Sequence, residues 1–289
     1  MTAVRMAACL GLAGWLAACA GTSPTPTVPP TPAPVDRPTG AGELVLRVEL
    51  RGGLLPPLDR ERQLPTMSIY GDGLVLVPAE VPDIFPGPAG YEFRSFWIDD
   101  ALVDQIVAGG LSIGLRGPER HLPQEGPDFV ADAGGTVVTL IANGQRHVTT
   151  ADALFDGADE TGERRLLAEF LERLRSLERG GGEAHEADSY RVFVAAPDPG
   201  FGGEPEAGPP VPWPFDGELA SWGEPLPADG LTVDARCRVL DGEELAGALP
   251  FLRSTTASTV VRDEAGTEAI VAYRPLLPDE TGCAGDADL

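Results

Sequence analysis

The sequence has 289 residues, with 45 acidic residues against 21 basic ones, and its net charge is −24 at pH 7. Nucleic acids and anionic membrane surfaces are bound by clustered cations, so this balance argues against both as electrostatic partners. A hydrophobic content of 43% is enough for a globular core, while 36 Gly and 29 Pro indicate many turns and long loops.

Residues 1–18 have the order of a secretion signal. Arg5 is followed by an apolar run over residues 6–16, which is shorter than the ~20 residues that a spanning helix needs. The motif Leu-Ala-Ala-Cys at 16–19 resembles the signal of bacterial lipoproteins. This resemblance implies that Cys19 is acylated, becomes the first residue of the mature chain and anchors it to the cell membrane on the extracytoplasmic face. The alternative is ordinary signal cleavage, with Cys19 incidental.

The segment after the signal is rich in Pro and Thr and contains few residues able to form a core. Proline-rich chains run extended, so residues 19–42 are predicted to form a tether between the lipid and the folded part. Of the remaining cysteines, Cys9 lies in the signal, which leaves Cys237 and Cys283. An exported chain favours a disulfide between them, with two free buried thiols as the alternative.

The first folded domain is predicted over residues 43–179. Residues 43–51 alternate between apolar and polar side chains, which predicts a strand with one buried face. A hairpin is predicted around Gly71-Asp72-Gly73, with a glycine at positive φ. A helix is expected to begin after Asp99 and to stop at Gly109.

A second hairpin is predicted around Asn143-Gly144, the strongest short turn signal in the chain. A helix over residues 163–178 follows, and its apolar stripe includes Leu166 and Leu167. Strands, hairpins and helices in this order indicate an α+β fold, in which small antiparallel sheets built of hairpins carry helices packed on one face.

A second, smaller α+β domain is predicted over residues 188–289, after a Gly/Glu-rich linker at 180–188. It contains a long acidic, proline-rich loop over 197–229, which Trp213 and Trp222 are expected to hold against the domain. The other expected elements are a strand at 190–195, a strand at 236–240, a helix that starts at a capping box of Asp241 and Glu244 and ends or bends at Pro250, and a hairpin of 259–262 with 269–274.

The segment Pro-Thr-Met-Ser-Ile-Tyr-Gly-Asp-Gly at 65–73 resembles a strand-turn segment in an uncharacterised family of exported bacterial domains. Asp132 lies where that family has a loop aspartate. The tail over 274–283, Arg-Pro-Leu-Leu-Pro-Asp-Glu followed by Cys283, resembles the C-terminus of bacterial lipoproteins of unknown function. The resemblance implies a fold and a location, and it implies no activity.

Two patterns could indicate catalysis. Residues 110–114 match Gly-x-Ser-x-Gly, which would make Ser112 a nucleophile, but that motif needs a strand before the serine and a helix after it. Here a helix is expected before Ser112 and a short extended segment after it. The adjacent carboxylates at 99–100 and 279–280 could serve acid–base chemistry, although a chain with 45 acidic residues contains such pairs by chance.

Metal-binding patterns are weak. His121, His147 and His185 are far apart in sequence and form no ligand motif, so structural or solvated roles are expected for them. The acidic segment at 156–160 lacks the register of a calcium loop. We therefore expect neither a metal nor a cofactor.

The pattern as a whole favours a lipid-anchored envelope protein with a non-enzymatic binding or structural role. Its expected partners are the membrane, through the lipid, and an unidentified envelope protein, with no nucleic acid. An envelope hydrolase that uses Ser112 or the paired carboxylates is the alternative. A solute-binding component of a transporter fits less well, because it would need larger alternating α/β lobes.

Overall fold

The computed structural model describes residues 35–53, 55–124, 130, 133–154, 161–197, 208–226 and 235–283. Residues 34–289 belong to one compact unit. Cys19, Asp132 and the acidic segment at 156–160 lie outside the described residues, so the predictions made for them stay predictions.

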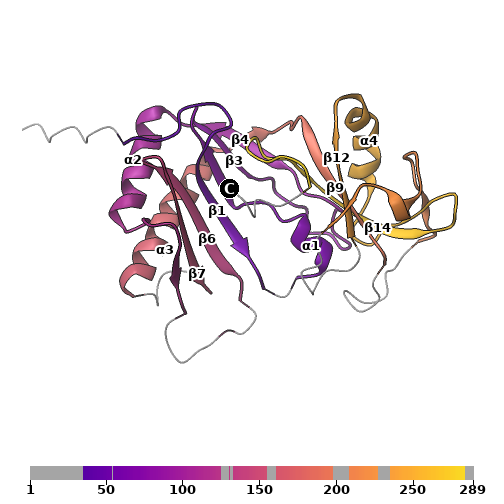
Figure 1. The fold of residues 1–289 in the computed structure, drawn as a ribbon, viewed down its shortest axis with the longest axis horizontal. Coiled ribbons are helices and arrows are strands. Elements are labelled where there is room, and N and C mark those ends of the chain that lie inside the picture. Colours follow the sequence, from indigo (N-terminus) through magenta and orange to yellow (C-terminus); the bar gives the residue numbers. More distant parts are fainter. Residues whose placement is uncertain are drawn as a thin grey trace, which may run out of the picture. The chain divides into compact units, whose positions relative to one another are not determined.

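The fold is α+β, as the sequence predicts, and contains two sheets (Figure 1). The first sheet has the strand order β5-β7-β6-β1-β2-β3-β4-β8, and the second has the order β10-β13-β14-β9-β12-β11. Neighbouring strands are antiparallel, except for the parallel edge pairs β5–β7 and β10–β13. The strands are β1 Leu44–Arg51, β2 Met67–Tyr70, β3 Leu74–Pro78, β4 Phe93–Trp97, β5 Arg120–Leu122, β6 Gly135–Ala142, β7 Gln145–Asp152, β8 Glu183–Ala184, β9 Ser189–Ala195, β10 Val211–Pro212, β11 Glu224–Pro225, β12 Ala235–Asp241, β13 Val260–Arg262 and β14 Glu268–Pro275.

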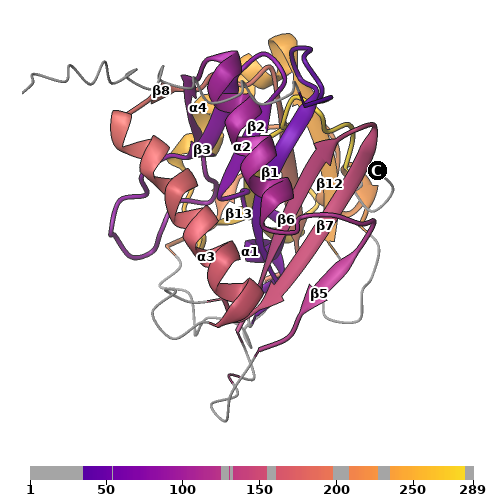
Figure 2. The same ribbon diagram turned by 90° about the vertical axis from the view of Figure 1, so that its left-hand side faces the viewer.

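The longer helices cover one face of each sheet, and the short α1 contacts β9 and β14 of the second sheet. Figure 2 shows α2 and α3 lying in front of the first sheet, where their apolar residues join those of the strands in one core. The helix α4 packs on β9 and β12 of the second sheet, where a second core includes two tryptophans. The helices are α1 Pro57–Glu61, α2 Asp100–Ser112, α3 Gly162–Arg175 and α4 Gly242–Ser254, and short 3-10 helices occupy η1 Ser176–Gly180 and η2 Leu219–Ser221.

The prediction that β1 has one buried face is wrong. Arg47, which the alternation places on the outer face, is only 4% exposed, and its guanidinium donates to Asp279 Oδ1 at 2.6 Å. Leu50, placed on the inner face, is 47% exposed. The C-terminal segment after β14 contacts the second face of β1, so an arginine is buried there with a carboxylate partner.

The hairpin β2–β3 is confirmed, and Gly73 provides its backbone geometry. Gly73 has a φ of +89°, a region that side chains with a Cβ rarely occupy. A Cβ at this position would lie 2.2 Å from the carbonyl oxygen of Ile98, so the backbone at Ile98 would have to move. Both the turn and the neighbouring chain therefore require glycine here.

Replacing Gly73 with Ala is expected to lower the free energy of unfolding by about 1–3 kcal/mol, because strained φ and the displaced Ile98 carbonyl act together. Gly144 is the matched control, because it has a φ of +67° and open space around its Cβ position. Urea denaturation should show a smaller loss for Gly144→Ala. Equal losses would mean that the contact with Ile98 contributes nothing.

The helix α2 begins as predicted but extends past Gly109. Asp99 Oδ1 accepts the backbone N–H of Leu102 at 2.8 Å, which caps the first turn. The helix ends at Ser112, and Gly114, at a φ of +95°, is the glycine that terminates it. Gly110 lies inside the helix, and a Cβ at this position would be only 3.1 Å from Leu140. The absence of a side chain therefore lets the helix lie close to the sheet.

The hairpin β6–β7 is confirmed, with Asn143 and Gly144 both at positive φ. The apolar stripe of α3 is confirmed except at Leu166, which is 37% exposed. Arg164 instead takes a buried place on this helix, and its guanidinium donates to backbone carbonyls such as those of Leu122 and Pro123.

The capping box expected at the start of α4 does not form. Asp241 makes no side-chain cap to the helix, and Glu244, the other half of the expected box, pairs with Arg238. Of the two alternatives for Pro250, it does not end the helix, which continues to Ser254. Pro250 and Ala246 are both exposed, so the proline lies on the solvent side of the helix, opposite its buried residues.

Part of the predicted tether is attached to the folded unit. The Arg37 guanidinium donates to Asp104 Oδ1 at 2.6 Å and to Asp100 Oδ1 at 3.1 Å, and its side chain is 4% exposed. Arg37 therefore attaches this part of the predicted tether to α2. The predicted linker at 180–188 also contains a strand, β8, which pairs with β4.

Candidate binding pocket at the edge of the second sheet

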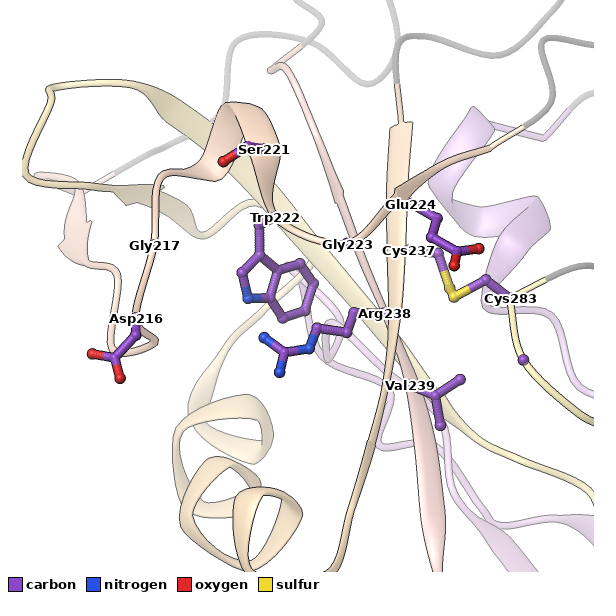
Figure 3. Close-up of a pocket in the computed structure, with 11 residues that line it drawn as sticks. Asp216, Gly217, Ser221, Trp222, Gly223, Glu224, Cys237, Arg238, Val239 and Cys283 are labelled. Carbon is purple, nitrogen blue, oxygen red and sulfur yellow. A yellow bond between two sulfur atoms is a disulfide. The ribbon is translucent and has the colours of Figure 1, made fainter.

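A pocket of about 430 Å³ lies at the edge of the second sheet, where β11 and β12 run side by side (Figure 3). Its residues come from three segments: the chain that leads into β11 and includes its first residue, the strand β12, and the end of the C-terminal segment. They are Asp216, Gly217, Ser221, Trp222, Gly223, Glu224, Cys237, Arg238, Val239, Gly282 and Cys283.

One wall combines an aromatic ring with a cation. Trp222 is buried and packs edge-on against Trp213, with 5.1 Å between ring centroids. The guanidinium of Arg238 lies 5.7 Å from the centroid of the Trp222 ring, and Figure 3 shows it extending toward the indole. Arg238 also forms an ion pair of 2.9 Å with Glu244, so its charge is balanced within the protein. The prediction that the two tryptophans hold the long loop against the domain is confirmed for the described residues 208–226.

The opposite wall contains the disulfide. Cys237 and Cys283 are bonded, with their Cα atoms 5.8 Å apart, which confirms the predicted pairing. Figure 3 places this bond and Val239 on the other side of β12 from Trp222 and Arg238. The pocket therefore reaches around the edge of one strand and touches both of its faces.

The floor between the walls is the backbone of β12. The strand β11 is only two residues long and pairs Glu224 with Cys237 and Pro225 with Arg236. The chain leaves β12 at Gly223, which has a φ of +73° and where a Cβ would lie 2.2 Å from the Cys237 carbonyl oxygen. Beyond Cys237, β11 therefore no longer pairs with the outer edge of β12, and this edge lines the pocket.

Buried ion pairs hold the C-terminal wall in place. Arg274 donates to both oxygens of Glu280, at 2.7 Å and 2.9 Å, and Arg191 lies 3.5 Å from the same carboxylate. Burial by itself would raise the pKa of Glu280, but the hydrogen bonds and charges of the two arginines outweigh it, so the pKa lies below its usual value. The segment that carries Cys283 is thus fixed by charge as well as by the disulfide.

The neighbouring carboxylate, Asp279, has different partners. It accepts from Arg47 at 2.6 Å and from the Tyr70 hydroxyl at 2.9 Å. Burial, with the negative charge of Asp279 next, raises the pKa of Tyr70, so the phenol stays neutral and acts as a donor. Asp279 and Glu280 therefore belong to two separate structural networks, and their carboxylates are not arranged to act on the same substrate atom.

The other carboxylate pair and the candidate nucleophile also have local structural partners. Asp99 caps α2, and Asp100 pairs with Arg37. Ser112 lies in the last turn of α2, is exposed, and donates its hydroxyl hydrogen to the Gly109 carbonyl at 2.7 Å. This serine therefore ends a helix, whereas the serine of a nucleophile elbow lies in a turn between a strand and a helix.

The histidines lie apart from one another. His121 Nε2 is 2.7 Å from Asp152 Oδ2 at the surface, while His147 is buried and accepts the Gly117 N–H at 3.0 Å through Nδ1. Burial lowers the pKa of His185, with Asp188 opposing it. Among the residues that the structure describes, no group of three or more His, Cys, Asp or Glu side chains could hold a metal ion.

Comparison of the chain with models of protein families, with curated proteins and with solved structures finds no match in any of the three. In the described part of the chain, no helix has the length and apolar character needed to cross a bilayer. The function therefore has to be argued from the geometry of this chain alone.

The sequence reasoning identified Trp222 and the two cysteines but missed Arg238 and Val239. The run Ala-Arg-Cys-Arg-Val at 235–239 contained a usable signal. Its two arginines alternate with a cysteine and a valine, which gives the strand one polar and one apolar face. What the run could not reveal was that β11 stops after two residues and leaves this strand accessible.

Proposed function

We propose that this protein is a lipid-anchored envelope protein on the extracytoplasmic face of the cell membrane, and that its folded unit binds another protein without performing catalysis. The observation that carries the proposal is the pocket around the edge of β12, which brings together exposed acidic side chains, strand backbone and the largely buried ring of Trp222. Protein-binding sites characteristically combine a well-packed centre with a polar rim. The lipoprotein-like motif at 16–19 supports the location.

Photo-crosslinking from the pocket tests the binding role. The chain contains no lysine, so amine-reactive reagents have no side chain to attack and a photoreactive amino acid is needed instead. Placed at Ser221, on the exposed rim of the pocket, it should give a discrete protein adduct in intact cells. Glu169 on α3, with its side chain 52% exposed, is the matched control position and should give no such adduct. Adducts of equal yield from both positions, or from neither, would contradict the proposal.

Replacing Cys19 with Ala tests the anchor. Without the cysteine there is no thiol to carry lipid, so the variant should leave the membrane fraction, whereas the wild-type chain should stay there and incorporate labelled fatty acid. Cys9→Ala, within the signal, is the control and should leave the labelling unchanged. Unlabelled wild-type protein, or a Cys19→Ala variant that is still labelled, would refute acylation at this residue.

A further inference from the structure

The outer edge of β12 has backbone groups that point into the pocket. The backbone N–H of Leu226 donates to the carbonyl of Ala235 at 2.9 Å, which shows that Ala235 directs its hydrogen-bonding groups toward β11. These groups alternate in direction along a strand, so those of Cys237 and Val239 point the same way. In the described chain, no backbone hydrogen bond reaches Val239 from that side.

The inner edge of the same strand is fully used. Seven residues of β12 are in register with β9, from Ala235 opposite Ala195 to Asp241 opposite Ser189. The backbone N–H and C=O of Arg238 point toward β9, opposite Val192, while its side chain lies beside Trp222 in one wall of the pocket. A ligand that pairs with Val239 would therefore extend the second sheet without displacing any strand of it.

The two walls suit the side chains of an added strand. Successive side chains of a strand point to opposite faces of its sheet. A strand continuing the line of β11 would direct one side chain toward Trp222 and the next toward Val239 and the disulfide. A pocket that extends around both faces of a strand edge matches this alternation better than it matches a compact ligand.

The charges around the edge select the partner. Asp216 and Glu224 are exposed at the pocket, and Asp241 is exposed at the end of β12. The one cation in the pocket wall, Arg238, is paired with Glu244. The rim is therefore acidic, which complements basic side chains and repels acidic ones.

We propose that this pocket takes an extended segment of a partner protein, carrying basic side chains, which adds to β12 as an antiparallel strand. Backbone hydrogen bonds to Val239 supply the pairing, and the two walls and the acidic rim select the side chains. This inference rests on the proposed function, because it specifies how the partner protein is held.

The substitution Val239→Pro isolates the backbone contact. Proline removes the N–H that points into the pocket, and it is tolerated on an edge strand where that N–H faces solvent. Val239→Ala is the matched control, because it shortens the same side chain but keeps the N–H. With the photoreactive residue at Ser221, the adduct should fall about tenfold or more in Val239→Pro and stay within about threefold of the parent in Val239→Ala. The unfolding midpoint of both variants should remain close to that of the parent.

The outcomes separate the two proposals. An adduct that survives Val239→Pro, or is lost equally in Val239→Ala, overturns strand addition and leaves a protein-binding pocket. An adduct that is absent from the parent overturns both. Mass spectrometry of the adduct should place the crosslink in a basic, extended segment of the partner, and a crosslink to an acidic segment, a helix or a lipid would overturn the inference. Asp216→Asn combined with Glu224→Gln should lower the yield several-fold, and an unchanged yield would remove the role of charge.

Discussion

Replacing Glu280 with Gln is expected to lower the free energy of unfolding by about 3–5 kcal/mol, because it removes one member of a buried charge network. The side chains of Glu280 and Arg274 are only 5% and 8% exposed, and that of Arg191 is 3% exposed. Glutamine has nearly the same shape but no charge, so two arginines would remain buried without their anion. Urea denaturation at neutral pH measures the loss.

Glu268 provides the matched control, since it pairs with Arg262 at the surface of the same sheet with its side chain 39% exposed. Solvent screens such a pair, so Glu268→Gln should change the stability by less than about 1 kcal/mol. A Glu280→Gln variant no less stable than Glu268→Gln would show that the buried network contributes little, and that the C-terminal segment is held by the disulfide and by apolar packing.

The same network predicts a pH dependence. The pKa of Glu280 is lower in the folded chain than its unfolded value of 4.5, so its contribution is fully present above that value and is lost as the pH falls through the lower, folded pKa. The difference in stability between wild type and Glu280→Gln should therefore be constant at higher pH and shrink below about pH 4.5. A difference that grows on acidification would contradict the assignment.

Removing the disulfide is the second large expected effect. Cys237 and Cys283 close a loop with a sequence separation of 46, for which the chain-entropy model gives about 4 kcal/mol. Cys237→Ala combined with Cys283→Ala should lose a similar amount in urea denaturation. The unreduced wild-type chain should show no free thiol from this pair when it is denatured and titrated, and two free thiols would refute the bond.

The disulfide variant also separates stability from binding. Cys237 and Cys283 form one wall of the pocket, and the C-terminal segment ends the described chain at residue 283. Because Glu280 remains paired with Arg274 in this variant, the segment should stay in place up to that residue. The wall formed by the disulfide is lost, so crosslinking from Ser221 should weaken more than it does in the surface variant Glu268→Gln. Full crosslinking in the disulfide variant would show that this wall does not contact the partner.

Local elements were predictable from the sequence because their causes are local. Asn143-Gly144 and Gly73 determine their hairpins through backbone conformations that few residues adopt. The apolar spacing in α3 and the cap at Asp99 likewise depend on residues within a few positions. The pairing of Cys237 with Cys283 followed from counting the cysteines, given the expectation that the chain is exported. The α+β class required only the order of such elements.

The errors arose where distant segments meet. The apolar face of β1 places Arg47 in solvent, yet its partner Asp279 is 232 positions further along the chain. There a tertiary contact outweighs a local preference, which carries little free energy of its own. Gly109 is a local stop signal, but α2 continues to Ser112, and Gly110 inside it packs closely on Leu140 of the first sheet.

The pocket could not be predicted from any single segment. Its existence depends on where β11 ends along β12, and on a C-terminal segment held by Arg274 and by the disulfide. The hairpins, the main helices and the cysteine pair are readable from the sequence, since short-range backbone and periodicity rules and the cysteine count govern them. Which strand edge stays open and which charges are buried depend on contacts between residues that are far apart in the chain, so these features emerge only when the chain is folded.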